Sequence, residues 1–196
     1  MIALFGLGNP GERYQCTPHN AGFLFADALA EQWSGEHSWT FARRYTADII
    51  KTTLHNMDVL LAKPQTFMNE SGKSVAAALN FFHLQPNDIV VIHDDVDLPL
   101  GEVRMQFDRG SAGHKGVESI FTALGTREFY RLRIGVMPAS STILDTQTFV
   151  THPLNAEDLA LLSVSVQSAA QSFADLLGVQ SLAEIQNVVH TQKSSL

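Results

Sequence analysis

One histidine and a group of carboxylates have the residue types and spacing for acid–base chemistry. His19 follows a glycine-containing loop, and Asp94 and Asp95 follow His93 after a run of four apolar residues. Histidine titrates near neutral pH and can take a proton from water, while a carboxylate that accepts its other N–H fixes the tautomer. A metal site and a surface histidine are the alternatives. The sequence favours the carboxylate-oriented histidine, with one aspartate as partner because consecutive strand residues face opposite sides.

A glycine motif precedes this histidine and presents an asparagine. Residues 6–11 read Gly-Leu-Gly-Asn-Pro-Gly and match the dinucleotide-binding pattern G-x-G-x-x-G. That interpretation needs a helix that begins inside the motif, but Pro10 removes a donor, and no acidic residue ends a second strand ~20 positions later. The sequence therefore favours a tight turn that places Asn9 at the carboxyl end of a strand.

Another amide and a thiol are weaker candidates. Asn69 lies between Pro64 and Gly72, ahead of an expected helix, where an amide can donate to an oxyanion or hold a water molecule; the alternative is plain helix capping. Cys16 lies three residues before His19 and suggests a thiol–base pair. Nothing nearby would activate this thiol, so a small apolar role is the better interpretation.

Alternating strands and helices must position these residues. Apolar runs predict strands at 2–7, 45–53, 57–62, 88–93, 103–107 and 131–136. Helical spacing predicts helices at 21–33, 71–83, 117–124 and 155–177, with a glycine-rich loop at 110–116 and a short helix after 178. The pattern predicts an α/β fold: one domain over residues 1–196, built as a three-layer α/β/α sandwich with a central mixed, mostly parallel sheet.

Composition excludes several classes of protein. The chain has 196 residues, 45% of them hydrophobic, and a formal net charge of −7, which argues against general polyanion binding. A single cysteine excludes an internal disulfide and a multi-cysteine zinc site. No apolar run reaches the ~20 residues of a membrane span, and the N-terminus resembles a strand more than a signal peptide, so we expect a cytoplasmic protein. Residues 101–133 contain six lysine and arginine side chains, which could bind a phosphate or form an ordinary solvated surface.

Together these segments resemble the bacterial-type peptidyl-tRNA hydrolase family. The matching stretches occur in the family's order and spacing and are GLGNPGERYQCTPHNAG (6–22), KPQTFMNESGKSV (63–75), HDDVDLPLG (93–101), GSAGHKG (110–116) and RLRIGV (131–136). They cover the chain to about residue 136, and the acidic tail matches only in its helical character. The resemblance implies a monomeric cytoplasmic esterase without metal or cofactor, which cleaves the ester between a peptide and the 3′ ribose of tRNA.

The resemblance also implies roles for individual residues. The catalytic group would be His19 as base, Asp94 as its orienting carboxylate, and the groove asparagines Asn9 and Asn69. Contacts to substrate or tRNA would come from Asn69 and from Tyr14, Phe67, His114, Lys115, Arg104 and Arg133, of which Arg133 matches a residue associated with the tRNA 5′-phosphate.

The chain departs from the family pattern in its recognition segments and keeps the catalytic ones. Pro18 replaces a usual arginine, Lys115 replaces the asparagine of Gly-His-Asn-Gly, and Gln106 stands where a second phosphate-binding cation is common. Asp108 and Arg109 replace part of a glycine run. A divergent relative that binds tRNA or the ribosome with weak or no hydrolysis, and another small esterase, are therefore the alternative functions.

Overall fold

The structure is a computed structural model and describes residues 1–33, 38–139 and 145–189. Its strands are β1 (Ile2–Gly6), β2 (Thr40–Ala42), β3 (Ala47–Leu54), β4 (Met57–Pro64), β5 (Ile89–Pro99), β6 (Val103–Phe107) and β7 (Tyr130–Met137). Its helices are α1 (Ala21–Gln32), α2 (Ser71–Phe82), α3 (Lys115–Leu124), α4 (Thr146–Thr151), α5 (Ala156–Leu176) and α6 (Leu182–Val188). No helix in these ranges is long and apolar enough to cross a membrane.

The strands form one mixed sheet in the order β2-β3-β4-β1-β5-β7-β6. β1 pairs in parallel with β4 and β5, and β5 pairs in parallel with β7, so the centre of the sheet is parallel. The outer pairs β2–β3, β3–β4 and β6–β7 are antiparallel. The predicted mixed sheet with a parallel centre is confirmed, and so is the hairpin, which turns at His55 and Asn56 with positive φ angles.

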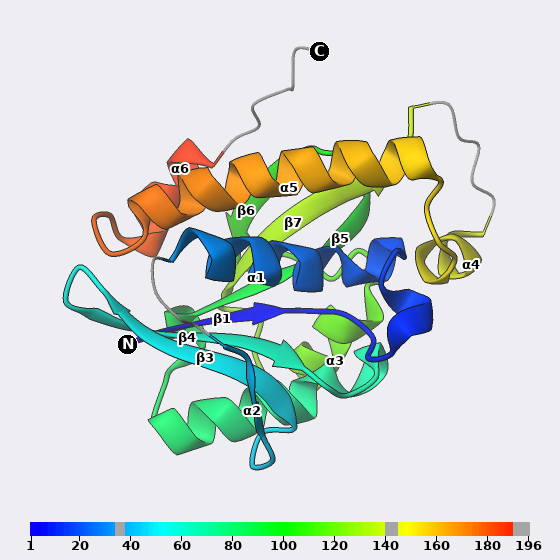
Figure 1. The fold of residues 1–196 in the computed structure, drawn as a ribbon. Coiled ribbons are helices and arrows are strands. Elements are labelled where there is room, and N and C mark those ends of the chain that lie inside the picture. Colours follow the sequence, from blue (N-terminus) through cyan, green and yellow to red (C-terminus); the bar gives the residue numbers. More distant parts are fainter. Residues whose placement is uncertain (34–37, 140–144, 190–196) are drawn as a thin grey trace.

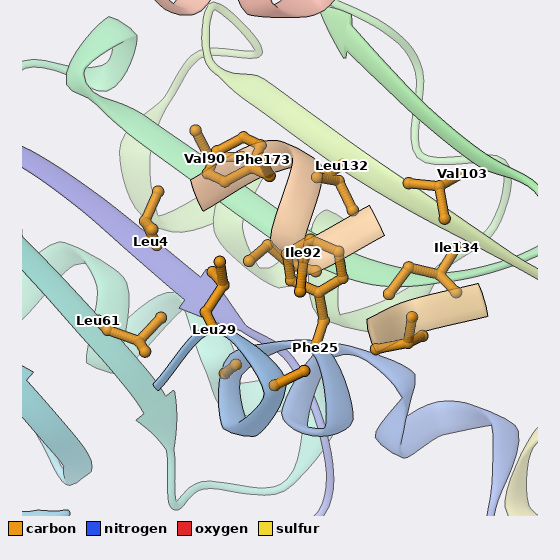
Figure 2. Packing of buried hydrophobic residues seen from close by; sticks show 14 of the residues in the cluster. Leu4, Phe25, Leu29, Leu61, Val90, Ile92, Val103, Leu132, Ile134 and Phe173 are labelled. Carbon is orange, nitrogen blue, oxygen red and sulfur yellow. The ribbon is translucent and has the colours of Figure 1, made fainter. Parts of the chain in front are cut away.

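Helices cover both faces of the sheet and give the predicted three layers (Figure 1). Phe25 and Leu29 of α1 and Phe173 of α5 pack on one face, against Leu4 and Ile92 among others (Figure 2). The hydrophobic residues of α2 and α3 form a second core on the opposite face. Because β1 and β5 are covered on both faces, their ends are fixed rigidly, which suits them to position a site.

Several element boundaries differ from the prediction. β5 continues past His93 to Pro99, so Asp94 and Asp95 lie inside the strand and not after it. α3 begins at Lys115, two residues earlier than expected, and β2 and α4 were not predicted because they are short and mostly exposed. The alternative interpretation of Asn69 as the cap of α2 is wrong: Glu70 is the N-cap residue and makes no side-chain capping bond.

Two glycines let α1 approach the carboxyl ends of β1 and β5. A Cβ atom on Gly22 would lie 2.3 Å from the carbonyl oxygen of Ile92 and 2.4 Å from the backbone nitrogen of Leu7. A Cβ atom on Gly6 would lie 2.3 Å from the carbonyl oxygen of Gly22. The missing side chains therefore set the position of the short 3₁₀ helix Pro18–Asn20, which immediately precedes α1 and carries His19.

We expect Gly22→Ala to lower the free energy of unfolding by about 3 kcal/mol, because the added methyl group meets backbone that cannot move aside. Urea unfolding of both proteins measures this difference. Gly110→Ala is the matched control, since a Cβ at Gly110 meets nothing within 4 Å. An equal effect of the two substitutions would contradict a requirement for close approach at Gly22.

Candidate active site

A cleft of about 420 Å³ lies at the carboxyl ends of β1 and β5. His19, Asp94 and His114 line its polar floor, and Phe67 and Met68 lie along its wall. Part of the wall comes from α4, through Thr146, Gln147, Val150 and Thr151. The cleft thus brings together segments that are far apart in the sequence.

His19 is held by Asp94 in the geometry of a base and its orienting carboxylate. The Nδ1 atom of His19 lies 2.9 Å from Oδ1 and 3.0 Å from Oδ2 of Asp94. Because a carboxylate only accepts, Nδ1 carries the proton in this contact, and the neutral ring then has its lone pair on Nε2. Both residues are buried, with His19 8% and Asp94 2% exposed. The ring can therefore accept a proton at Nε2.

His114 is a second partner of the same carboxylate. Its Nε2 lies 2.9 Å from Oδ1 of Asp94, and its Nδ1 accepts from the backbone N–H groups of Gly116 (3.1 Å) and Val117 (3.3 Å). His114 is thereby the N-cap residue of α3, and the capping bonds place its proton on Nε2. The start of α3 is thus tied to the buried carboxylate.

The charge of Asp94 is stabilised by these two rings. Burial alone would raise its pKa, but attraction to the N–H groups of His19 and His114, and the hydrogen bonds that both rings donate, hold the pKa well below its usual range. Behind them, burial is the main cause that lowers the pKa of His93, and repulsion from Arg131 lowers it further, so that ring is neutral. Asp94 therefore remains an anion that accepts from two imidazoles.

The same three residues could be considered as metal ligands, because one ligand atom of each of His19, Asp94 and His114 lies within 4.8 Å of the others. A histidine ligates through a nitrogen that carries no proton. The nitrogen of His114 that faces Asp94 carries its proton, since the other nitrogen accepts two backbone N–H groups. The geometry fits a hydrogen-bonded group better than a metal site.

Three comparisons with known proteins find peptidyl-tRNA hydrolases. A family model described as peptidyl-tRNA hydrolase matches residues 3–195. The chain is 39% identical to a peptidyl-tRNA hydrolase of Mycobacterium sp. (strain KMS) over 96% of each chain, and 40% identical to one of Nocardia farcinica over 94% of each. The solved structure of peptidyl-tRNA hydrolase from Acinetobacter baumannii is 28% identical, with a TM-score of 0.87 over 97% of this chain and 95% of that one.

The chain belongs to the peptidyl-tRNA hydrolase family. The family match extends through the acidic tail, where the motifs of the sequence gave only a general likeness. The match places the buried histidine–carboxylate pair in a family of hydrolases. His19 and Asp94 are therefore the candidate catalytic residues of this hydrolase.

In this peptidyl-tRNA hydrolase family member, a network of amides joins two loops of the cleft. Asn20 donates from Nδ2 to the carbonyl oxygen of Asn9 (3.1 Å) and accepts its backbone N–H (2.8 Å). The Oδ1 atom of Asn9 accepts the backbone N–H of Met68 at 2.9 Å, which leaves its NH₂ group as the donor end. Asn69 follows Met68, is exposed and lines the cleft. Asn20 was not predicted as a site residue; its position beside His19 was the available signal.

We expect Asn20→Ala to lower the free energy of unfolding by about 2 kcal/mol, because two buried backbone groups of Asn9 lose their partners. The loop with Asn69 should shift with Asn9, and kcat/KM for peptidyl-tRNA should fall roughly tenfold. Unfolding and initial-rate measurements test both effects. Asn87→Ala, at an exposed position in the 3₁₀ helix Pro86–Asp88, is the matched control; activity equal to that of the control would refute the role of Asn20.

Two of the predicted basic contacts, Arg104 and Arg133, lie outside the cleft lining and are paired with other side chains. Nε of Arg133 lies 2.6 Å from Oδ2 of Asp95, and its Nη1 lies 2.7 Å from Oε1 of Gln106. Arg133 is only 3% exposed. Arg104 forms an ion pair with Glu102. The prediction that Arg104 and Arg133 contact tRNA, with Arg133 at the 5′-phosphate, remains a prediction, and the structure adds a role for Arg133 as the partner of the buried Asp95.

The remaining predicted residues divide between the cleft and its surroundings. Phe67 is 51% exposed and lines the cleft together with Lys115. Tyr14 lies outside the lining, where its hydroxyl accepts a hydrogen bond from Arg13. Cys16 is exposed and is also outside the lining, so the structure does not place its thiol with the histidines. Pro18 begins its 3₁₀ helix after an extended Thr17, as proline at a first helical position requires.

Proposed function

We propose that this chain hydrolyses the ester between peptide and tRNA in peptidyl-tRNA and so recycles tRNA. The observation that carries the proposal is His19 held through Nδ1 by Asp94, so that Nε2 is the free nitrogen of a ring that lines the cleft. The family match supplies the substrate class.

In the proposed reaction, Nε2 of His19 takes a proton from water as the water oxygen attacks the ester carbonyl carbon. Asp94 stabilises the imidazolium that forms. The tetrahedral intermediate then expels the 3′ ribose oxygen, which receives from Nε2 of His19 the proton that came from water. The products are a free tRNA hydroxyl and a peptide carboxylic acid, which releases its proton to solvent and becomes a carboxylate. The protein needs no covalent intermediate, metal or cofactor for this sequence of steps.

Amide donors are proposed to stabilise the charge that develops on the ester oxygen. Asn69 lines the cleft as an exposed amide. In Asn9, the Oδ1 atom already accepts the backbone N–H of Met68, so the NH₂ group is the part of the side chain that can donate to substrate. A correctly placed donor contributes about 3 kcal/mol to the transition state of acyl transfer. Phe67 and His114 are proposed to contact the acyl part and Lys115 the nucleotide part, with Tyr14, Arg104 and Arg133 on tRNA outside the cleft.

The setting of this activity is proposed as well. We propose one domain over residues 1–196 that acts as a monomer in the cytoplasm, where peptidyl-tRNA arises. The two hydrophobic cores on either side of a single sheet support the single domain.

Hydrolysis of peptidyl-tRNA and of a short acylated adenosine by the purified protein tests the function. We expect cleavage of the tRNA-linked ester with a much higher kcat/KM, because most of the contacts outside the cleft are to tRNA. Equal cleavage of both would instead indicate a general small esterase. Binding of tRNA without hydrolysis would indicate the non-hydrolytic relative and overturn the proposal.

A further inference from the structure

Lys115 places an ammonium group at the cleft that holds His19. It is the first residue of α3 and directly follows His114, which caps α3 and donates a hydrogen bond to Asp94. Among the described residues that line the cleft, Lys115 is the only lysine or arginine. Its Nζ lies 3.4 Å from Oε1 of Gln147 on α4, across the cleft from α3.

This ammonium group has no anionic partner within the part of the chain that the structure describes. The ion pairs found there leave Lys115 out, while Asp94 is engaged by two histidines and Asp95 by Arg133. A neutral acceptor at 3.4 Å is a weak contact. The start of a helix is also an unfavourable place for a cation, because the helix dipole is positive there. An incoming anion would therefore improve the surroundings of Lys115.

The proposed substrate brings an anion to this place. The ribose that carries the ester also carries a phosphodiester at its 5′ carbon, so the phosphate lies a fixed number of bonds from the reacting carbonyl. Every peptidyl-tRNA has this group, whereas acidic side chains of the peptide vary between substrates. Lysine binds phosphate as a point charge and needs no fixed fork geometry.

We propose that Lys115 binds the phosphodiester on the 5′ side of the terminal nucleoside and so selects nucleotide over nucleoside esters. This phosphate is distinct from the 5′-terminal phosphate of tRNA considered for Arg133. The inference rests on the proposed function for the identity of the substrate. Gln147 releases the ammonium group when the phosphate arrives, and a charge-assisted bond replaces the weak neutral one.

Two stable analogues test the inference without hydrolysis. In both, a dipeptide is joined by an amide to 3′-amino-3′-deoxyadenosine; one has a free 5′-hydroxyl and the other a 5′ methyl phosphodiester. Calorimetry gives the dissociation constant of each. We expect the wild-type protein to bind the phosphodiester roughly tenfold more tightly, as for one charge-assisted contact. Lys115→Gln should bring this ratio to about one, while Lys115→Arg should keep most of it.

Lys51→Gln is the matched control for the change in net charge. Lys51 lies over Phe82 and beside Met1, at the edge where the parallel strands begin. This variant should keep the wild-type ratio. Equal affinity of the wild-type protein for the two analogues, including a failure to bind either, would overturn the inference, and so would a ratio that survives Lys115→Gln. Hydrolysis of peptidyl-tRNA, measured on the same preparations, separates a failure of this inference from a failure of the proposed function.

Discussion

His19→Asn is expected to lower kcat/KM for peptidyl-tRNA on the order of 10³-fold, because the attacking water loses its base. The side chain of asparagine can still reach toward Asp94, so the buried carboxylate keeps a donor and the fold is preserved. Initial rates at saturating and limiting substrate measure the loss. We expect it in kcat, since binding of substrate does not require proton transfer.

His55→Asn is the matched control for this substitution. His55 lies in the β3–β4 turn with φ of 46°, a conformation that asparagine tolerates. It should leave kcat/KM within about twofold of wild type, as is usual for an exposed position away from the site. A rate for His19→Asn close to that of the control, in folded protein, would remove His19 from the mechanism.

Asp94→Asn is expected to lower kcat roughly 10²- to 10³-fold while the cleft keeps its shape. An amide at this position can present its NH₂ group to Nδ1 of His19, which would move the histidine proton to Nε2 and remove the base. The neutral side chain also no longer stabilises the imidazolium. Initial rates with peptidyl-tRNA, together with the dissociation constant for deacylated tRNA, test this effect on kcat. Loss of affinity with unchanged kcat would assign Asp94 to binding instead.

The same variant has a consequence for acid stability. The pKa of Asp94 in the folded protein lies well below the value of about 3.8 expected when unfolded. Its contribution to stability is thus complete above that value and is lost as the pH falls below it. Urea unfolding at pH 6 and pH 2.5 should show that the free energy of unfolding falls less between these two pH values for Asp94→Asn than for wild type. An identical loss would contradict a depressed pKa.

The central strand shows what the sequence could predict and where prediction stopped. Residues 89–92 are consecutive apolar residues, and such a run indicates a strand buried on both faces. The strand continues through polar residues because Asp94 and Asp95 pair with Ile134 and Gly135 of β7, and each carboxylate finds partners at the end of the sheet. Local polarity could not reveal this, because the partners come from distant segments. The predicted division of the two aspartates to opposite faces agrees with their different partners, His19 and Arg133.

His114 and the cleft wall from α4 are the parts of the site that the sequence predicted least well. His114 was predicted as a substrate contact in a glycine-rich loop, but its bond to Asp94 depends on its position as the cap of α3. The wall from α4 was not predicted because six mostly exposed residues have no clear apolar period. Asp145 is the signal that was available, since its carboxylate caps Gln147 and Thr148.

Nitrogen-15 NMR of the histidine side chains tests most directly the claim that Asp94 orients His19 as a base. The His19 signals are assigned by their loss in His19→Asn. In the neutral form we predict a proton on Nδ1, hydrogen-bonded to Asp94, and an unprotonated Nε2. A neutral ring with its proton on Nε2 would contradict the proposed role of His19, since that nitrogen could not then accept a proton from water.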